Sequence, residues 1–249
     1  MSVGQGLMII PISAPVMGKM DTVYPILFWD EDQVVLVDTG FPDQLEQLYS
    51  AFHSARLKPA RLKRIIMTHQ DIDHIGNLQS LLEDSTYPIE VYAHKLEKPY
   101  IEGEKRILRF TDQAIASIDQ LPKSVPASFR EGLKRIMLHP PKAPVSHTIS
   151  DQDHFAWCGG LIVIETPGHT PGHISLYHQA SKMLIAGDAL IARDGQLHGP
   201  DRVTSLDHRL AQDSVKRLLD YEIESVLCYH GGIYEGDVQK RLQEIVDEG

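Results

Sequence analysis

Four apolar segments of this 249-residue chain each end in a histidine or an aspartate. The segments are short and rich in Ile, Leu and Val, as is typical of buried strands. Strand ends at one edge of a sheet carry the loops on which function gathers. The side chains that follow the four segments are His69, Asp71, Asp73, His74, His169, Asp188 and His230. The pattern therefore predicts a sheet protein with one polar site at a sheet edge.

The order of the remaining elements predicts a mixed α/β fold. The first half has strands at 7–12, 22–30 and 33–40, with an acidic hairpin turn at 30–32. Helices that start near Pro42 and at 75 then alternate with strands at 63–69 and 88–94. The second half repeats this order. It has strands at 161–168, 173–178 and 182–188, an irregular loop at 189–205, a helix near 206–219, a strand at 224–232 and a closing helix at about 235–247.

The segment from about 95 to 147 differs from both halves. Apolar residues recur at helical spacing over 107–121 and 129–137, and several prolines separate these runs. Ser128 and Glu131 have the spacing of a capping box at the start of the second run. We interpret the segment as a helical insertion within a single domain that spans residues 1–249. Its apolar face is either part of the core or a lid over the site.

The composition narrows the range of partners. A net charge of −10 and a pI near 5.7 argue against nucleic acid as the main partner. No stretch is apolar over a membrane-spanning length, and the amino terminus lacks the basic region of a signal peptide, so we expect a cytoplasmic protein with no membrane partner. Cys158 and Cys228 lie in apolar runs and are expected to be buried free thiols. A small-molecule substrate is the expected partner, and the sequence carries no signal for oligomeric state.

Five motifs in order resemble the metallo-β-lactamase superfamily. They are VDTG (37–40), THQDIDH (68–74), TPGHTPGH (166–173), AGD (186–188) and CYHGG (228–232). The resemblance covers essentially the whole chain. It implies an α/β (α+β) fold, namely a four-layer αββα sandwich with a dinuclear metal site at one edge.

The resemblance also assigns roles to the seven polar residues. His69 and His169 would hold the first metal ion, Asp73, His74 and His230 the second, and Asp188 would bridge the two. Asp38, Thr39 and His173 would support these ligands rather than bind metal themselves.

Asp71 is the main departure from the family's H-x-H-x-D-H motif, because it stands where the second histidine is usual. We expect it to ligate the first metal directly. With four histidines and three aspartates, two divalent ions and one hydroxide leave the site neutral rather than positively charged. A more anionic site shifts the preference from zinc toward manganese or iron, and related flavodiiron-type members with a carboxylate at this position use iron.

The implied activity is hydrolysis of a lactone, ester or thioester carbonyl by a metal-bridging hydroxide. Asp73 is the expected catalytic proton shuttle, and His198, in the loop after Asp188, is a candidate for substrate binding. Homoserine-lactone-cleaving relatives carry a tyrosine shortly after the bridging aspartate, whereas Ala189 to Ile191 follow here. The alternative is an iron-dependent redox enzyme that uses oxygen or persulfide chemistry on the same fold.

Overall fold

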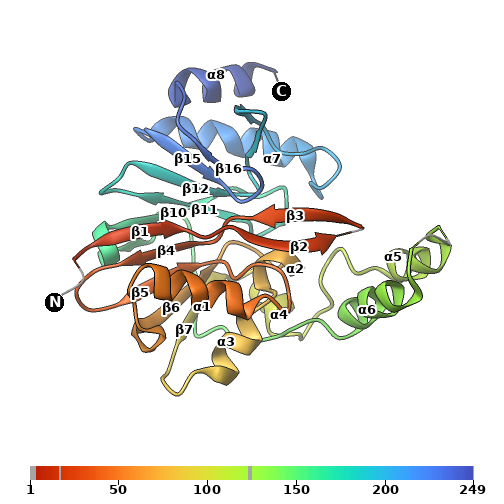
Figure 1. Ribbon diagram of the computed structural model, residues 1–249. Helices are drawn as coiled ribbons and strands as arrows, with labels where there is room; N and C mark the ends of the chain where they lie inside the picture. Colours follow the sequence, from red (N-terminus) through yellow and green to blue (C-terminus); the bar gives the residue numbers. More distant parts are fainter. Residues whose placement is uncertain (1–3, 17, 123–124, 249) are drawn as a thin grey trace.

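Two six-stranded sheets pack face to face in the computed structural model, which describes residues 4–16, 18–122 and 125–248 (Figure 1). The first sheet has the order β1 (Gly6–Ile9), β4 (Ile26–Trp29), β5 (Val34–Val37), β6 (Leu62–Met67), β7 (Glu90–His94) and β8 (His147–Ile149). The second has the order β16 (Gly232–Tyr234), β15 (Ser225–Cys228), β12 (Met183–Gly187), β11 (Ile174–His178), β10 (Leu161–Glu165) and β9 (His154–Phe155). Strands β5 to β8 are parallel to one another, and β12 is parallel to β15. Because parallel strands end at the same edge of their sheet, the loops after β6, β12 and β15 lie at sheet edges.

Helices cover the outer faces of both sheets (Figure 1). Helices α1 (Leu45–Ser54) and α3 (Leu78–Asp84) lie against the first sheet, and α7 (His208–Val215) and α8 (Val238–Glu248) against the second. The short helix α2 (Ile72–Ile75) lies directly after β6. The layers are therefore helix, sheet, sheet and helix, and the expected αββα sandwich is confirmed.

The central strands are apolar on both faces because each face meets a different layer. In β5, Val35 and Val37 point into the core between the sheets, whereas Val34 and Leu36 pack with α1. In β6, Ile66 points into the core between the sheets and Ile65 packs on the helix side. This double burial explains why the strands read as unbroken apolar runs rather than as alternating patterns.

Several predicted boundaries are wrong, and prolines explain two of them. Pro11 and Pro25 interrupt the strands expected at 7–12 and 22–30, because proline cannot donate to a sheet ladder. The interrupted ends form a separate hairpin of β2 (Ile12–Val16) and β3 (Lys19–Val23), which extends beyond the sandwich (Figure 1). The helix expected at 75–84 is also divided, into α2 and α3, where Gly76 meets the backbone of Gly40 and Pro42 too closely for any Cβ.

The loop expected to be irregular at 189–205 contains a hairpin of β13 (Ile191–Arg193) and β14 (Gln196–His198). Asp194 and Gly195 form its turn, and both have positive φ angles, 53° and 73°. An Asp-Gly pair is the favoured sequence of such a two-residue turn. The signal was therefore present in the sequence, but the strands beside it are too short to stand out.

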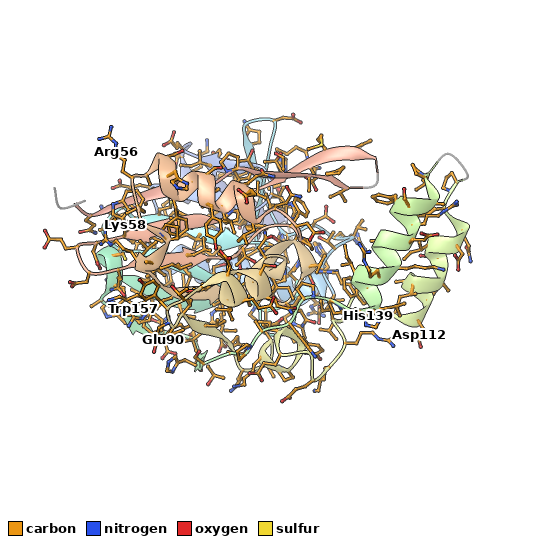
Figure 2. The ribbon with its side chains drawn as sticks, turned by 60° about the horizontal axis from the view of Figure 1, so that its bottom comes forward. Arg56, Lys58, Glu90, Asp112, His139 and Trp157 are labelled. Carbon is orange, nitrogen blue, oxygen red and sulfur yellow. The ribbon has the colours of Figure 1, made fainter. Side chains whose placement is uncertain are left out.

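The described part of the 95–147 segment contains the α-helices α4 (Lys98–Ile101), α5 (Asp112–Ser117) and α6 (Ala127–Leu138). The pair α5 and α6 stands apart from the sandwich, at the same end as the β2–β3 hairpin (Figure 1). Figure 2 shows Asp112 and His139 at this end and Glu90 and Trp157 at the other. The predicted capping box is wrong, because α6 begins after Pro126 and no side chain caps it.

Short 3-10 helices complete the secondary structure, at Pro59–Arg61, Ile118–Gln120, Trp157–Gly159 and Lys216–Asp220. Both cysteines are buried and free, as expected. Burial raises the pKa of the Cys158 thiol to about 12, so this thiol is unreactive in the folded protein. Within the described ranges, none of the helices combines the length and the apolar character required to cross a bilayer.

Candidate metal centre

The seven side chains converge at one edge of the sandwich, where the loops after β6, β10, β12 and β15 meet. Metal-binding atoms of His69, His169 and Asp188 form one compact group, and those of Asp73, His74 and His230 form another. The Asp188 carboxylate joins the two groups. Its Oδ2 lies 3.2 Å from Nε2 of His169 and its Oδ1 lies 3.3 Å from Nε2 of His74. Separations of this size between donor atoms suit ligands that share one small cation.

Unpartnered polar atoms show that these residues fit metal ions. Nε2 of His69, Nε2 of His74 and Oδ1 of Asp188 are buried without a hydrogen-bond partner among the described residues. Buried polar atoms in proteins are almost always paired, so each unpaired one needs an explanation. Here three of them meet in one place, which is the arrangement that divalent ions would satisfy.

The electrostatic potential of the site also favours cations. Burial acts to lower the pKa of His230, but the carboxylates of Asp188 and Asp73 outweigh burial and raise that pKa to about 11. The pKa of His74 is raised to about 10 in the same way, by Asp38, Asp188 and Asp73 against the effect of burial. A potential that holds protons this strongly also holds metal ions, which compete with protons for the same nitrogen atoms.

Local structure explains how Asp71 enters the site. Asp71 precedes the first turn of α2, where an aspartate usually accepts a hydrogen bond from the helix backbone, yet its side chain makes no such bond. Its Oδ2 lies instead 3.1 Å from Nε2 of His169 and 3.4 Å from Nε2 of His69. Asp71 is therefore at the first group but is absent from its three-residue core, and direct ligation by Asp71 stays a prediction.

Three residues support the ligands as expected. Asp38 Oδ2 accepts a hydrogen bond of 2.9 Å from Nδ1 of His74, which leaves Nε2 of that imidazole for the metal. Thr39 donates its hydroxyl to the backbone oxygen of His74. His173 accepts a bond of 2.9 Å from the backbone N–H of Asp188, so it positions the bridging residue.

Tyr229, which directly follows β15, contacts several groups of the site. Its ring stacks on His74 with centroids 3.7 Å apart. Its hydroxyl donates to the backbone oxygen of Asp73 at 2.6 Å and accepts from the N–H of Gly40 at 3.1 Å. The tyrosine thus connects the end of β15 to α2, the helix that carries Asp73 and His74.

Replacing Tyr229 by phenylalanine is expected to lower the free energy of unfolding by about 1–3 kcal/mol, because the backbone groups of Asp73 and Gly40 lose their partner. Chemical denaturation of both proteins measures the difference. The same replacement at Tyr87, which is 57% exposed, is the control and should change little. A Tyr229 variant as stable as the wild type would show that these bonds are not needed.

Two site residues were missed from the sequence, and both come from the 95–147 segment. Glu97 is fully buried and accepts four hydrogen bonds, from the backbone and side chain of Gln70, from Thr170 and from the N–H of Gly172. It therefore holds the His69 loop against the His169 loop. Arg109 forms an ion pair with Asp71. Neither residue belongs to a motif, so only the folded chain could identify them.

Five of the seven side chains, all except His69 and His74, line a cavity of about 260 Å³. Asp73, Asp188 and His230 form its polar wall, and apolar side chains face them; these are Ile72, Ile107, Phe110 and Val203. Ile107 and Phe110 belong to the 95–147 segment and are also buried members of the hydrophobic core on the α1 side of the first sheet. Part of that segment thus serves both as core and as a wall of the cavity.

His198 lies elsewhere. It is on β14 and lines a separate cavity of about 640 Å³ with His208 and Gln212. A third cavity connects the two regions, because it includes Asp188 and His230 as well as Arg193 and Asp201. A substrate role for His198 stays a prediction, and it would require a ligand that extends along this path.

Comparison with models of known protein families confirms the class of protein that the fold and the site indicate. The model of the metallo-beta-lactamase superfamily matches residues 20–230, and the chain belongs to that superfamily.

Its relatives include hydrolases by name. The chain is 30% identical over 208 residues to a protein of Bacillus subtilis (strain 168) described as "Probable metallo-hydrolase YflN", and the match covers 79% of this chain and 75% of the relative. It is 28% identical over 211 residues to "Probable metallo-hydrolase YybB" of the same organism, with 84% and 81% covered. Among solved structures, a metallo-beta-lactamase family protein from Thermus thermophilus, TTHA1429, superposes with a TM-score of 0.70 at 25% identity, over 98% of this chain and 79% of that one.

Proposed function

We propose that this protein is a metal-dependent hydrolase of a small-molecule lactone, ester or thioester. The observation that supports it most is the convergence of unpartnered, buried donor atoms from separate loops at the mouth of a cavity, within the part of the chain that the structure describes. The relatives described as metallo-hydrolases support the same class.

Divalent ions held by the two groups would supply a Lewis acid and lower the pKa of a bound water to roughly 7. Asp188 holds the two groups together, and Asp38 and His173 keep His74 and Asp188 in position. Asp73 is the ligand best placed to move a proton, because its side chain is 19% exposed and faces the cavity. Its Oδ2 lies 3.2 Å from Nε2 of His230.

The cavity supports an acyl substrate with an apolar group. Ile107, Phe110 and Val203 offer apolar surface opposite the carboxylates, so a short acyl chain could lie there with its carbonyl toward the ligands. Val203 is 91% exposed, so its side chain is accessible to a ligand.

Metal removal tests the proposal. Purified protein is treated with a chelator and reloaded separately with Zn²⁺, Mn²⁺ or Fe²⁺, then assayed on a panel of lactones, p-nitrophenyl esters and acyl thioesters. We expect chelation to reduce the hydrolysis rate by at least about 100-fold, and one of the ions to restore it, because the metal contributes several kcal/mol to the transition state.

The outcomes separate the two chemistries. Hydrolysis that survives complete metal removal would contradict the proposal. Tightly bound iron with oxygen uptake and no hydrolysis would favour the redox alternative instead.

A further inference from the structure

Arg109 reaches the metal centre from the loop between α4 and α5. Its Nε donates to Oδ2 of Asp71, and its Nη2 lies 2.9 Å from Nε2 of His169. The arginine side chain is 28% exposed, whereas those of Asp71 and His169 are 8% and 3% exposed. The guanidinium therefore enters a buried space from the cavity side.

This position conflicts with a metal ion at the first group. An imidazole nitrogen has a single lone pair in the ring plane. If Nε2 of His169 carries a proton, it donates that proton to Asp71 at 3.1 Å; if it does not, it accepts from Arg109 at 2.9 Å. In either state the lone pair is unavailable to a metal.

The second group differs. Ion pairs of Asp73, His74 and His230 in the described part of the chain involve only the histidines and aspartates of the site and its support Asp38. Among those residues, their donor atoms thus have no ion pair with a lysine or an arginine, unlike Asp71 of the first group.

We propose that the guanidinium of Arg109 holds the first cation position, so that the chain binds one divalent ion tightly at Asp73, His74, His230 and Asp188. A second ion binds at His69 and His169 only when Arg109 withdraws. This inference rests on the proposed metal-dependent function and concerns how the site is loaded.

Charge supports the proposal. The seven residues carry three carboxylates when the imidazoles are neutral. One divalent ion with a neutral water and one guanidinium balance those charges. Two divalent ions with one hydroxide already balance them without the guanidinium, so the guanidinium beside two ions leaves one excess positive charge. Excess charge of one sign is unfavourable in a buried space of low dielectric constant. Asp71 makes the arrangement possible, because a histidine at this position could not pair with Arg109 through a carboxylate.

Counting bound ions tests the proposal without an activity assay. Metal-free wild type and Arg109→Ala are titrated with Mn²⁺, and free Mn²⁺ is measured by its electron paramagnetic resonance signal. We expect wild type to bind one ion tightly and a second at least roughly 100-fold more weakly. Arg109→Ala should bind two ions with similar affinity, and their spectra should show magnetic coupling.

Matched variants separate a specific effect from a general one. Arg106 lies in the same loop and pairs with the exposed Asp112, whose position Figure 2 shows away from the sandwich; Arg106→Ala should bind Mn²⁺ as wild type does. Asp71→His removes the partner of Arg109 and adds a nitrogen ligand, so it should also bind two ions. Arg109→Gln and thermal melting of each variant control for folding.

Each remaining outcome is informative. Two tight ions in wild type, or an unchanged second affinity in both Arg109 variants, would overturn the role of Arg109. Loss of ions in Arg109→Gln would overturn it as well, because the arginine would then assist binding. If neither wild type nor any variant bound Mn²⁺ or Zn²⁺, the metal centre itself would be refuted, and with it the proposed function.

Discussion

Replacing Asp188 by asparagine or alanine is expected to abolish metal retention and to lower kcat/KM by at least about 1,000-fold. The Asp188 carboxylate lies within 3.6 Å of metal-binding nitrogens of three histidines, His74, His169 and His230. Removing its charge therefore weakens both groups at once, including the tight group expected to load first.

Asparagine preserves the shape of the side chain, so that variant tests charge rather than packing. Metal content after gel filtration and the hydrolysis rate on the best substrate of the panel are the two measurements. Asp213→Ala is a control, because Asp213 is exposed and its ion pair is with Lys216 on the surface. Retained metal and retained turnover in both Asp188 variants would refute the bridging role.

The second large effect is expected at Glu97, on stability rather than on chemistry. Its carboxylate is fully buried and accepts bonds of 2.7–3.1 Å from four donors on the loops that carry His69 and His169. Alanine would leave these donors buried without a partner, at a cost of about 3–5 kcal/mol in the free energy of unfolding.

Chemical denaturation measures this cost, and Glu104→Ala, at an exposed position of the same segment, is the control. The stability of Glu97→Gln should lie between those of the wild type and Glu97→Ala. The amide oxygen still accepts the hydrogen bonds of one carboxylate oxygen, whereas the amide nitrogen, a donor, faces the two donors that the other carboxylate oxygen had bound. Gly172 approaches Glu97 Oε1 so closely that a Cβ would lie 2.9 Å from it, so this position leaves no room for a side chain. A loss below about 1 kcal/mol in Glu97→Ala would mean that water replaces the carboxylate.

The polar residues that gather at the site could be predicted because each lies in a loop after a strand whose apolar run is long enough to recognise. The run before His69 and the run before Asp188 are buried on both faces, which makes them visible in the sequence alone. Ordered motifs then indicated which strand ends belong to one site, and the family match agrees. The β13–β14 hairpin and the division at Gly76 were missed because short elements have little periodicity to detect.

The roles of Glu97 and Arg109 could not be predicted from the sequence. Each acts on residues far away in the chain, Glu97 on Thr170 and Arg109 on His169. A glutamate before a proline-containing turn and an arginine in a polar loop are ordinary residues, and their local patterns indicate solvent exposure.

Local hydrophobic patterns were enough to predict a mixed α/β fold, the sheet edge at which polar residues gather and the residues that follow each strand, because buried strands leave recognisable apolar runs. The αββα layers came from the resemblance of five ordered motifs to the metallo-β-lactamase superfamily. Which charged side chains meet at that edge could be seen only in the folded chain. The fold of the 95–147 segment places one buried carboxylate between two ligand loops and one guanidinium against Asp71. Such contacts depend on the path of the chain in space, and long-range electrostatic pairing leaves no periodic signal from which it could be read.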